Sequence, residues 1–140
     1  MSALTSIAPS VEEMYLTAEK CFADLPDVMR KAAGDVRILV MDYAEDETLD
    51  EMDIDDALEL SGLYVGVPLT IESVTHPSEH RPLIYLYRLP ILFEWAQRGD
   101  VTVEELVRHV FIHELGHHFG WADEEMDAAL EAAEEDDAAE

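Results

Sequence analysis

Residues 113–123 read His-Glu-Leu-Gly-His-His-Phe-Gly-Trp-Ala-Asp, and this is the most specific stretch of the chain. His113 and His117 are four residues apart, so on a helix they project from one face about one turn apart and can reach a single ion. Glu114 directly follows the first histidine, where a carboxylate can act as the base that activates a bound water. The stretch therefore predicts a helix that carries a catalytic metal site, with an ordinary exposed helix glutamate as the alternative for Glu114.

The residues before this motif predict a long helix. Thr102 and Glu105 have the spacing of a capping box, and the helix is expected to run to about Phe119, where Gly120 stops it. Rotating the residues by about 100° each places several apolar side chains on the face of the two histidines. The histidines are thus expected to continue a buried stripe formed by Val103, Leu106 and Val110.

A third metal ligand is expected, because catalytic zinc sites have three protein ligands and one open position. Gly120 can take the left-handed conformation that turns a chain back at a helix end. It lies about 7.5 Å along the helix axis from the middle of the histidine pair. Three extended residues span about 10 Å, so Asp123 can reach the ion. Asp123 equally suits the N-cap of a final helix over residues 123–134, and in that case Glu134 or Glu135 becomes the candidate ligand.

The other histidines and the single cysteine have ordinary structural interpretations. His109 and His118 are expected to pack or to support the ligands, with His118 pointing away from the pair. His76 and His80 could bind a second ion, but a polar loop is the commoner meaning of such a segment. Cys21 is interpreted as a packing residue in a helix rather than as a nucleophile.

The remainder of the chain alternates between helical and extended patterns. Ser10 caps a first helix that ends before Pro26, and Gly62 and Gly66 are expected to permit tight turns around an extended segment. Strands are predicted over 36–41, 63–69 and 83–87, and a short helix over 91–98, closed by Gly99. The acidic stretch 42–59 is either a flexible loop or a short acidic helix.

The strand over 83–87 prompts two further interpretations. Tyr85 and Tyr87 alternate on it, and packing is favoured over a hydrogen bond to an oxyanion. An exposed edge along 83–87 could hold an extended peptide by strand addition.

Composition limits the functions that the chain can have. The 140 residues carry 8 Lys and Arg against 33 Asp and Glu, a formal charge of −25 that repels nucleic acid and anionic membranes. The first cation is Lys20, so the pattern of a secretory signal is absent, and no apolar run is long enough to span a bilayer. One cysteine forms no internal disulfide. We expect a cytoplasmic protein of one domain, residues 1–140, with an acidic tail that frays over about 135–140.

The eleven-residue motif resembles the metzincin-type pattern of zinc peptidases. Segments 62–69 and 84–88 and Pro90 extend the resemblance to the small bacterial minimal-zincin metallopeptidases, over most of residues 10–130. The resemblance implies a compact α+β fold, in which a small mixed sheet packs against helices that include the motif helix. It also implies one Zn²⁺ ion on His113, His117 and Asp123, with Glu114 as the base.

The chain departs from ordinary metzincins at two positions. Asp123 stands where most have histidine, and Met126 follows only three residues later, which leaves no room for a long loop before a methionine turn. Met126 either supplies a hydrophobic floor to the site or packs its helix, and packing is favoured.

The expected function is a zinc-dependent peptidase or amide hydrolase that acts on a peptide or protein substrate. One alternative is a non-catalytic zinc-binding interaction module, in which the metal holds the final helix in place and the acidic surface recruits a basic partner. Another is a latent peptidase in which residues 42–59 form a lid over the cleft.

Overall fold

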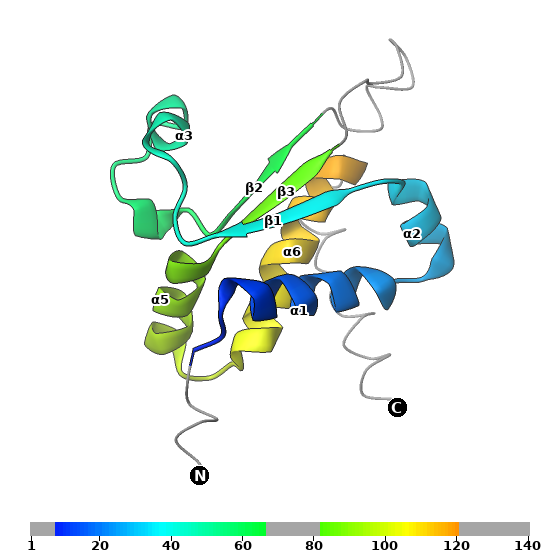
Figure 1. Cartoon of the computed structure of the whole chain (residues 1–140), viewed down its shortest axis with the longest axis horizontal. Helices are drawn as coiled ribbons and strands as arrows, with labels where there is room; N and C mark the ends of the chain where they lie inside the picture. The colour runs from blue at the N-terminus through cyan, green and yellow to red at the C-terminus, as the bar shows by residue number, and fades with distance from the viewer. Residues whose placement is uncertain (1–7, 67–81, 121–140) are drawn as a thin grey trace.

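The computed structural model of the chain describes residues 8–66 and 82–120 (Figure 1). In this part of the chain, the small mixed sheet and the helices packed against it confirm the expected α+β fold. The elements are, in chain order, α1 (Val11–Ala23), α2 (Asp27–Ala33), β1 (Arg37–Met41), α3 (Asp46–Glu51), the 3₁₀ helix η2 (Ala57–Glu59), β2 (Gly62–Val65), β3 (Leu83–Tyr87), α5 (Arg88–Arg98) and α6 (Val103–Phe119).

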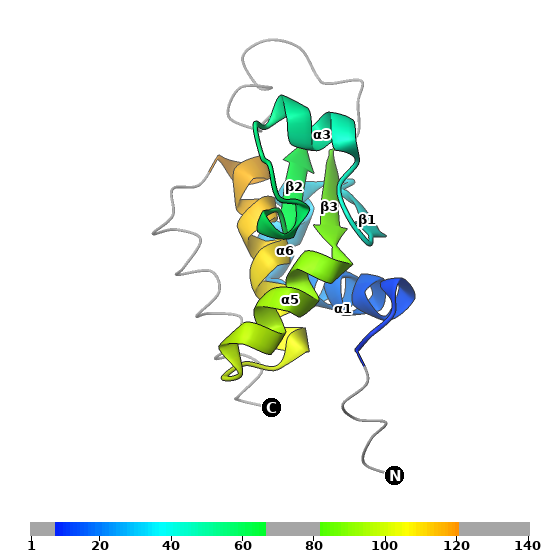
Figure 2. The ribbon, with the colours of Figure 1, turned by 90° about the vertical axis from the view of Figure 1, so that its left-hand side faces the viewer.

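The described strands form a sheet in the order β1-β3-β2. β1 lies parallel to β3, with Ile38 opposite Ile84, and β2 lies antiparallel to β3, with Leu63 opposite Tyr85. The expectation of an exposed edge along residues 83–87 is therefore wrong, because β3 has a strand on each side. Among the described strands, β1 and β2 are the outer ones, and β2 runs beside α6 (Figure 2).

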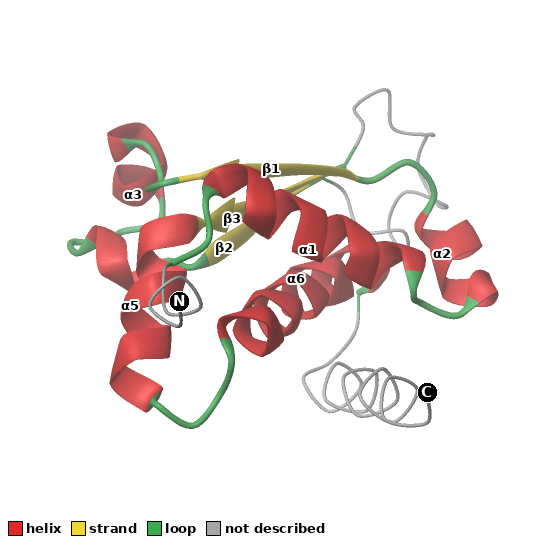
Figure 3. Ribbon diagram, turned by 60° about the horizontal axis from the view of Figure 1, so that its bottom comes forward, coloured by secondary structure: helices red, strands yellow, loops and turns green. Residues whose placement is uncertain are grey.

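The two faces of the sheet have different coverings. Ile84 and Leu86 are fully buried against α1 and α6, which lie on the same side of the sheet (Figure 3). Tyr87 is buried on the opposite face in a smaller cluster with Leu49 and Leu60, and the Tyr85 ring stacks on it with centroids 5.9 Å apart. Both tyrosines therefore pack, as the sequence favoured.

Within the described residues the predicted helices and strands are present, and their ends have clear physical causes. The final helix predicted over 123–134 and residues 67–69 of the predicted strand over 63–69 lie outside the described residues. Ser10 and Thr102 each begin a helix with a complete capping box, and Gly99 and Gly120 end helices in the left-handed conformation. α5 begins at Arg88 rather than Ile91, so Pro90 occupies the third helical position. The acidic stretch 42–59 contains α3 and η2, which confirms the short-helix alternative for part of it.

Sequence reasoning missed α2, the helix over 27–33. It has only seven residues, and Ala33 is its one buried side chain. Its sequence therefore has no apolar stripe from which a helix could be predicted. Cys21 is buried in the main core, which confirms its interpretation as a packing residue. Across residues 8–66 and 82–120, none of the helices combines the length and the apolar character needed to cross a membrane.

Candidate metal centre

α6 carries His113, Glu114 and His117, and the middle of this helix is tightly enclosed. Phe111, Ile112 and Leu115 are fully buried, which fixes the rotation of the helix about its own axis. His113 is half-buried, whereas 48% of the His117 side chain is exposed. The expected stripe is therefore buried at Leu106 and Val110, half-buried at His113 and exposed at His117, although the next residue, His118, is buried on another face of the helix.

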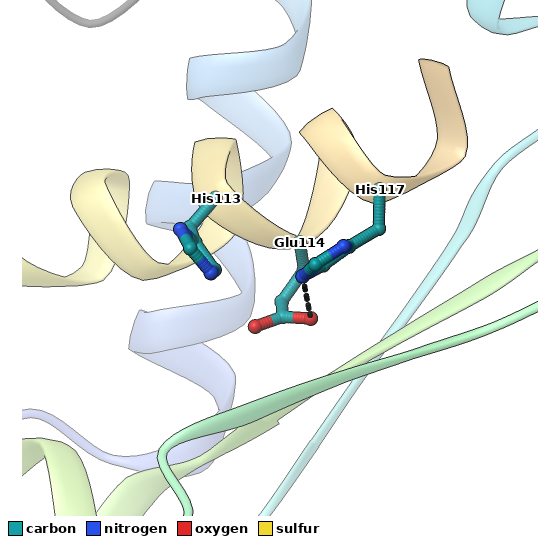
Figure 4. A group of neighbouring side chains, drawn as sticks. All are labelled: His113, Glu114 and His117. Atoms are coloured by element: carbon teal, nitrogen blue, oxygen red, sulfur yellow. Dashed lines mark ion pairs between the residues drawn. The ribbon is translucent and has the colours of Figure 1, made fainter. Parts of the chain in front are cut away.

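His113, Glu114 and His117 converge on the strand side of α6 (Figure 4). Each of the three offers one possible ligand atom, and these atoms all lie within 4.8 Å of one another. The two imidazole rings stand nearly perpendicular, at 87°, with centroids 5.1 Å apart. His117 Nε2 lies 3.9 Å from Glu114 Oε1.

This set of donors fits a zinc-type ion. Imidazole nitrogen and carboxylate oxygen are preferred zinc ligands, and two atoms that share one zinc ion lie no more than about 4.2 Å apart. The limit of 4.8 Å on the separations between the ligand atoms of His113, Glu114 and His117 is close to that range. The remaining candidate ligands, Asp123, Glu134 and Glu135, lie outside the described residues, as does Met126.

Glu114 is buried rather than exposed, so it is not an ordinary helix glutamate. Its exposed fraction is 9%. Burial raises the pKa of the Glu114 carboxyl from its ordinary value of 4.5 to about 7, because the charged form loses its hydration. The backbone N–H of Tyr64 donates to the carboxylate and opposes this rise. A carboxyl with a pKa close to neutrality can take up and release a proton under physiological conditions.

Gly62 explains how β2 comes so close to this carboxylate. A Cβ at Gly62 would lie 2.7 Å from Val110 Cγ1 and 3.1 Å from Glu114 Cγ. Neither Gly62 nor Gly66 is among the glycines with positive φ, and Gly62 lies within β2 rather than in a turn. The missing side chain at Gly62 instead lets the strand lie directly against α6.

His118 points away from the other two histidines, as predicted, and is 1% exposed. Its Nε2 lies 2.9 Å from the carbonyl oxygen of Ala33, which can only accept, so Nε2 donates. In the neutral imidazole, Nδ1 then accepts from the Tyr64 hydroxyl at 2.8 Å. His118 thus anchors the strand residue whose N–H contacts Glu114.

Sequence reasoning missed Tyr64, because nothing in a strand pattern shows which helix residue its hydroxyl will meet. The other predicted histidines are placed as follows. His109 is exposed at the rim of a hollow that His113 and Glu114 also line. His76 and His80 lie outside the described residues.

The family comparison agrees with this geometry. The model of a family described as zincin-like metallopeptidase matches residues 33–132, which include the whole motif. The chain belongs to the zincin-like metallopeptidase family. Membership of the zincin-like family implies a metal ion, typically zinc, and the grouping of His113, Glu114 and His117 suits one. No curated protein matches the chain.

Proposed function

We propose that this zincin-like protein is a zinc-dependent peptidase or amide hydrolase. In this proposal His113, His117 and Asp123 hold the ion, and Glu114 is the general base. The observation that carries it is the position of Glu114, nine-tenths buried and grouped with two imidazoles of one helix. Burial of a carboxylate is unfavourable, and a glutamate without a role at the site would lie at the surface instead.

When bound, zinc supplies Lewis-acid chemistry, because it polarises the scissile carbonyl and makes a water easier to deprotonate. Glu114 takes the proton of the attacking water and delivers it to the leaving amine nitrogen. The Tyr64 N–H orients the carboxylate for both transfers. The positive charge of an ion nearby would lower the pKa of Glu114 from about 7 and keep it ready as a base.

We propose that the substrate peptide binds along β2. β2 is an outer strand of the described sheet and passes directly beside Glu114, whereas β3 is enclosed by strands on both sides. An extended peptide can pair with an outer strand through main-chain hydrogen bonds. Because these bonds do not involve side chains, peptides of many sequences can form them.

The proposal is tested by measuring metal content and turnover together. The purified protein is expected to hold one zinc ion per chain and to cleave members of a peptide mixture, followed by mass spectrometry. Glu114→Gln should keep the zinc and lose activity by about 10²- to 10⁴-fold, the usual contribution of a general base. Glu104→Gln, an exposed change in the first turn of the same helix, should leave activity unchanged.

Activity that survives Glu114→Gln in full would remove this mechanism. Stoichiometric zinc without turnover on any peptide would instead favour the zinc-binding interaction module.

A further inference from the structure

Two hollows meet at Glu114, and their linings differ in chemistry. One has a volume of about 330 Å³ and the other about 440 Å³, which is within the usual range for ligand sites. Leu60, Gly62 and Glu114 line both, so the two hollows adjoin each other on either side of the buried carboxylate. A bound chain that reaches Glu114 would place neighbouring side chains in each of them.

The first hollow is acidic. Glu59 of η2 and Glu94 of α5 border it from two elements that contact each other, and His113 also lines it. Neither Lys nor Arg is among the described residues that line it. Glu94 has a weak competing partner, because Arg98 Nη1 lies 3.4 Å from its Oε2 at a solvent-exposed site. Such surface pairs are worth about 0–1 kcal/mol, so an incoming cation can replace Arg98.

The second hollow is apolar. Met52, Leu60, Leu63 and Tyr64 line it next to His117. Met52 is 42% exposed, so its side chain is accessible to an apolar group that enters this hollow. The thioether of methionine is flexible and polarisable, so it adapts to apolar groups of different shapes.

Building on the proposed function, we propose that the substrate carries a Lys or Arg side chain on one side of the scissile bond and an apolar side chain on the other. Glu59 and Glu94 are then specificity residues for the cation, and Met52 and Leu63 for the apolar group. The formal charge of −25 attracts cations to the whole surface, so it does not select a sequence. A particular substrate sequence is selected because the acidic hollow and the apolar hollow adjoin each other at the Glu114 carboxylate.

The test measures binding alone. The zinc-loaded Glu114→Gln full-length protein is titrated, at physiological ionic strength, against labelled peptides of equal length, with fluorescence anisotropy as the readout. The reference peptide has an adjacent Lys and Leu among alanines, in both orders. Matched peptides replace Lys by Gln, Leu by Ser, or both. The reference peptide in its better order should bind at least tenfold more tightly than either single replacement.

Variants assign each preference to its hollow. Adding Glu59→Gln and Glu94→Gln should remove the preference for Lys over Gln and leave the preference for Leu over Ser. Adding Met52→Ser should do the reverse. The control pair Glu12→Gln and Glu19→Gln removes the same charge from α1, away from both hollows, and should change affinity by less than twofold.

Equal affinity for the reference and doubly replaced peptides would overturn the proposal. An equal loss of affinity in the control pair would overturn it as well, because it would show attraction by net charge alone. Since the readout needs no cleavage, a failed peptidase assay together with the expected binding pattern would refute the proposed function and support these subsites. The variants added to the Glu114→Gln parent change exposed or half-exposed side chains, and their circular dichroism spectra should match that of the parent.

Discussion

Replacing Gly62 by alanine tests how tightly β2 is pressed against the motif helix. The added Cβ would lie 2.7 Å from Val110 Cγ1, whereas carbon atoms normally approach no closer than about 3.5 Å. It would also lie 3.1 Å from Glu114 Cγ and 3.3 Å from the backbone oxygen of Tyr85. Contacts therefore come from both the helix and the neighbouring strand, which restricts how β2 can relax.

The expected cost follows from which neighbour must move. Val110 is 8% exposed and belongs to the main core, so a shift of its side chain disturbs its packing there. Overpacking of this kind costs about 1–3 kcal/mol, and we expect Gly62→Ala to lower the free energy of unfolding by about 2 kcal/mol. Val110→Ala removes the atom in closest conflict, so the double variant should be at least about 1 kcal/mol more stable than the sum of the single effects.

Urea unfolding followed by far-ultraviolet circular dichroism gives the four free energies of this cycle. Gly99→Ala serves as the matched control, because Gly99 has a positive φ of 69° but nothing within 4 Å of its would-be Cβ. It should cost about 1 kcal/mol from backbone strain alone and add independently to Val110→Ala. A Gly62→Ala protein as stable as wild type, or one whose cost simply adds to that of Val110→Ala, would refute the close contact.

Three further changes have expected outcomes. In the metal-free protein the raised pKa of Glu114 means that the folded state favours the neutral acid. The contribution of Glu114 to the free energy of unfolding is therefore fully present below about pH 4.5 and is lost as pH rises through about 7. Glu114→Gln lacks that dependence, so its unfolding free energy should gain on wild type by on the order of 2 kcal/mol between pH 5 and pH 8. Thr102→Ala should cost about 1 kcal/mol in thermal or urea unfolding by removing the helix cap, and Thr102→Ser should restore most of it. Tyr64→Phe should cost about 1–3 kcal/mol because it leaves buried His118 Nδ1 without its donor, whereas Tyr15→Phe at an exposed hydroxyl should cost less than about 0.5 kcal/mol.

The candidate site was predictable where its geometry is local. The spacing of His113, Glu114 and His117 within one helix sets their relative directions, whatever the rest of the chain does. The ends of that helix were equally local, since Thr102 and Gly120 act on the backbone groups next to them. These features depend on hydrogen bonds that span only a few residues, so a sequence pattern specifies them.

The neighbours of the site were not predictable, because they are joined across long separations in the chain. Tyr64 is hydrogen-bonded to His118, which is 54 residues away in the chain, and His118 is hydrogen-bonded to Ala33, which is 85 residues away. The pairing of β3 with a strand on each side was equally hidden, since an apolar run does not reveal how many partners it will have.

The sequence by itself determined that two imidazoles and a carboxylate project from one helix, because helical periodicity follows from backbone geometry alone. Only the tertiary structure decided that Glu114 is buried beneath β2 and that its pKa rises to about 7. The physical reason is that desolvation depends on every group packed around a side chain. Here the decisive group is Gly62, whose missing side chain lets a strand from another part of the chain exclude water from the carboxylate.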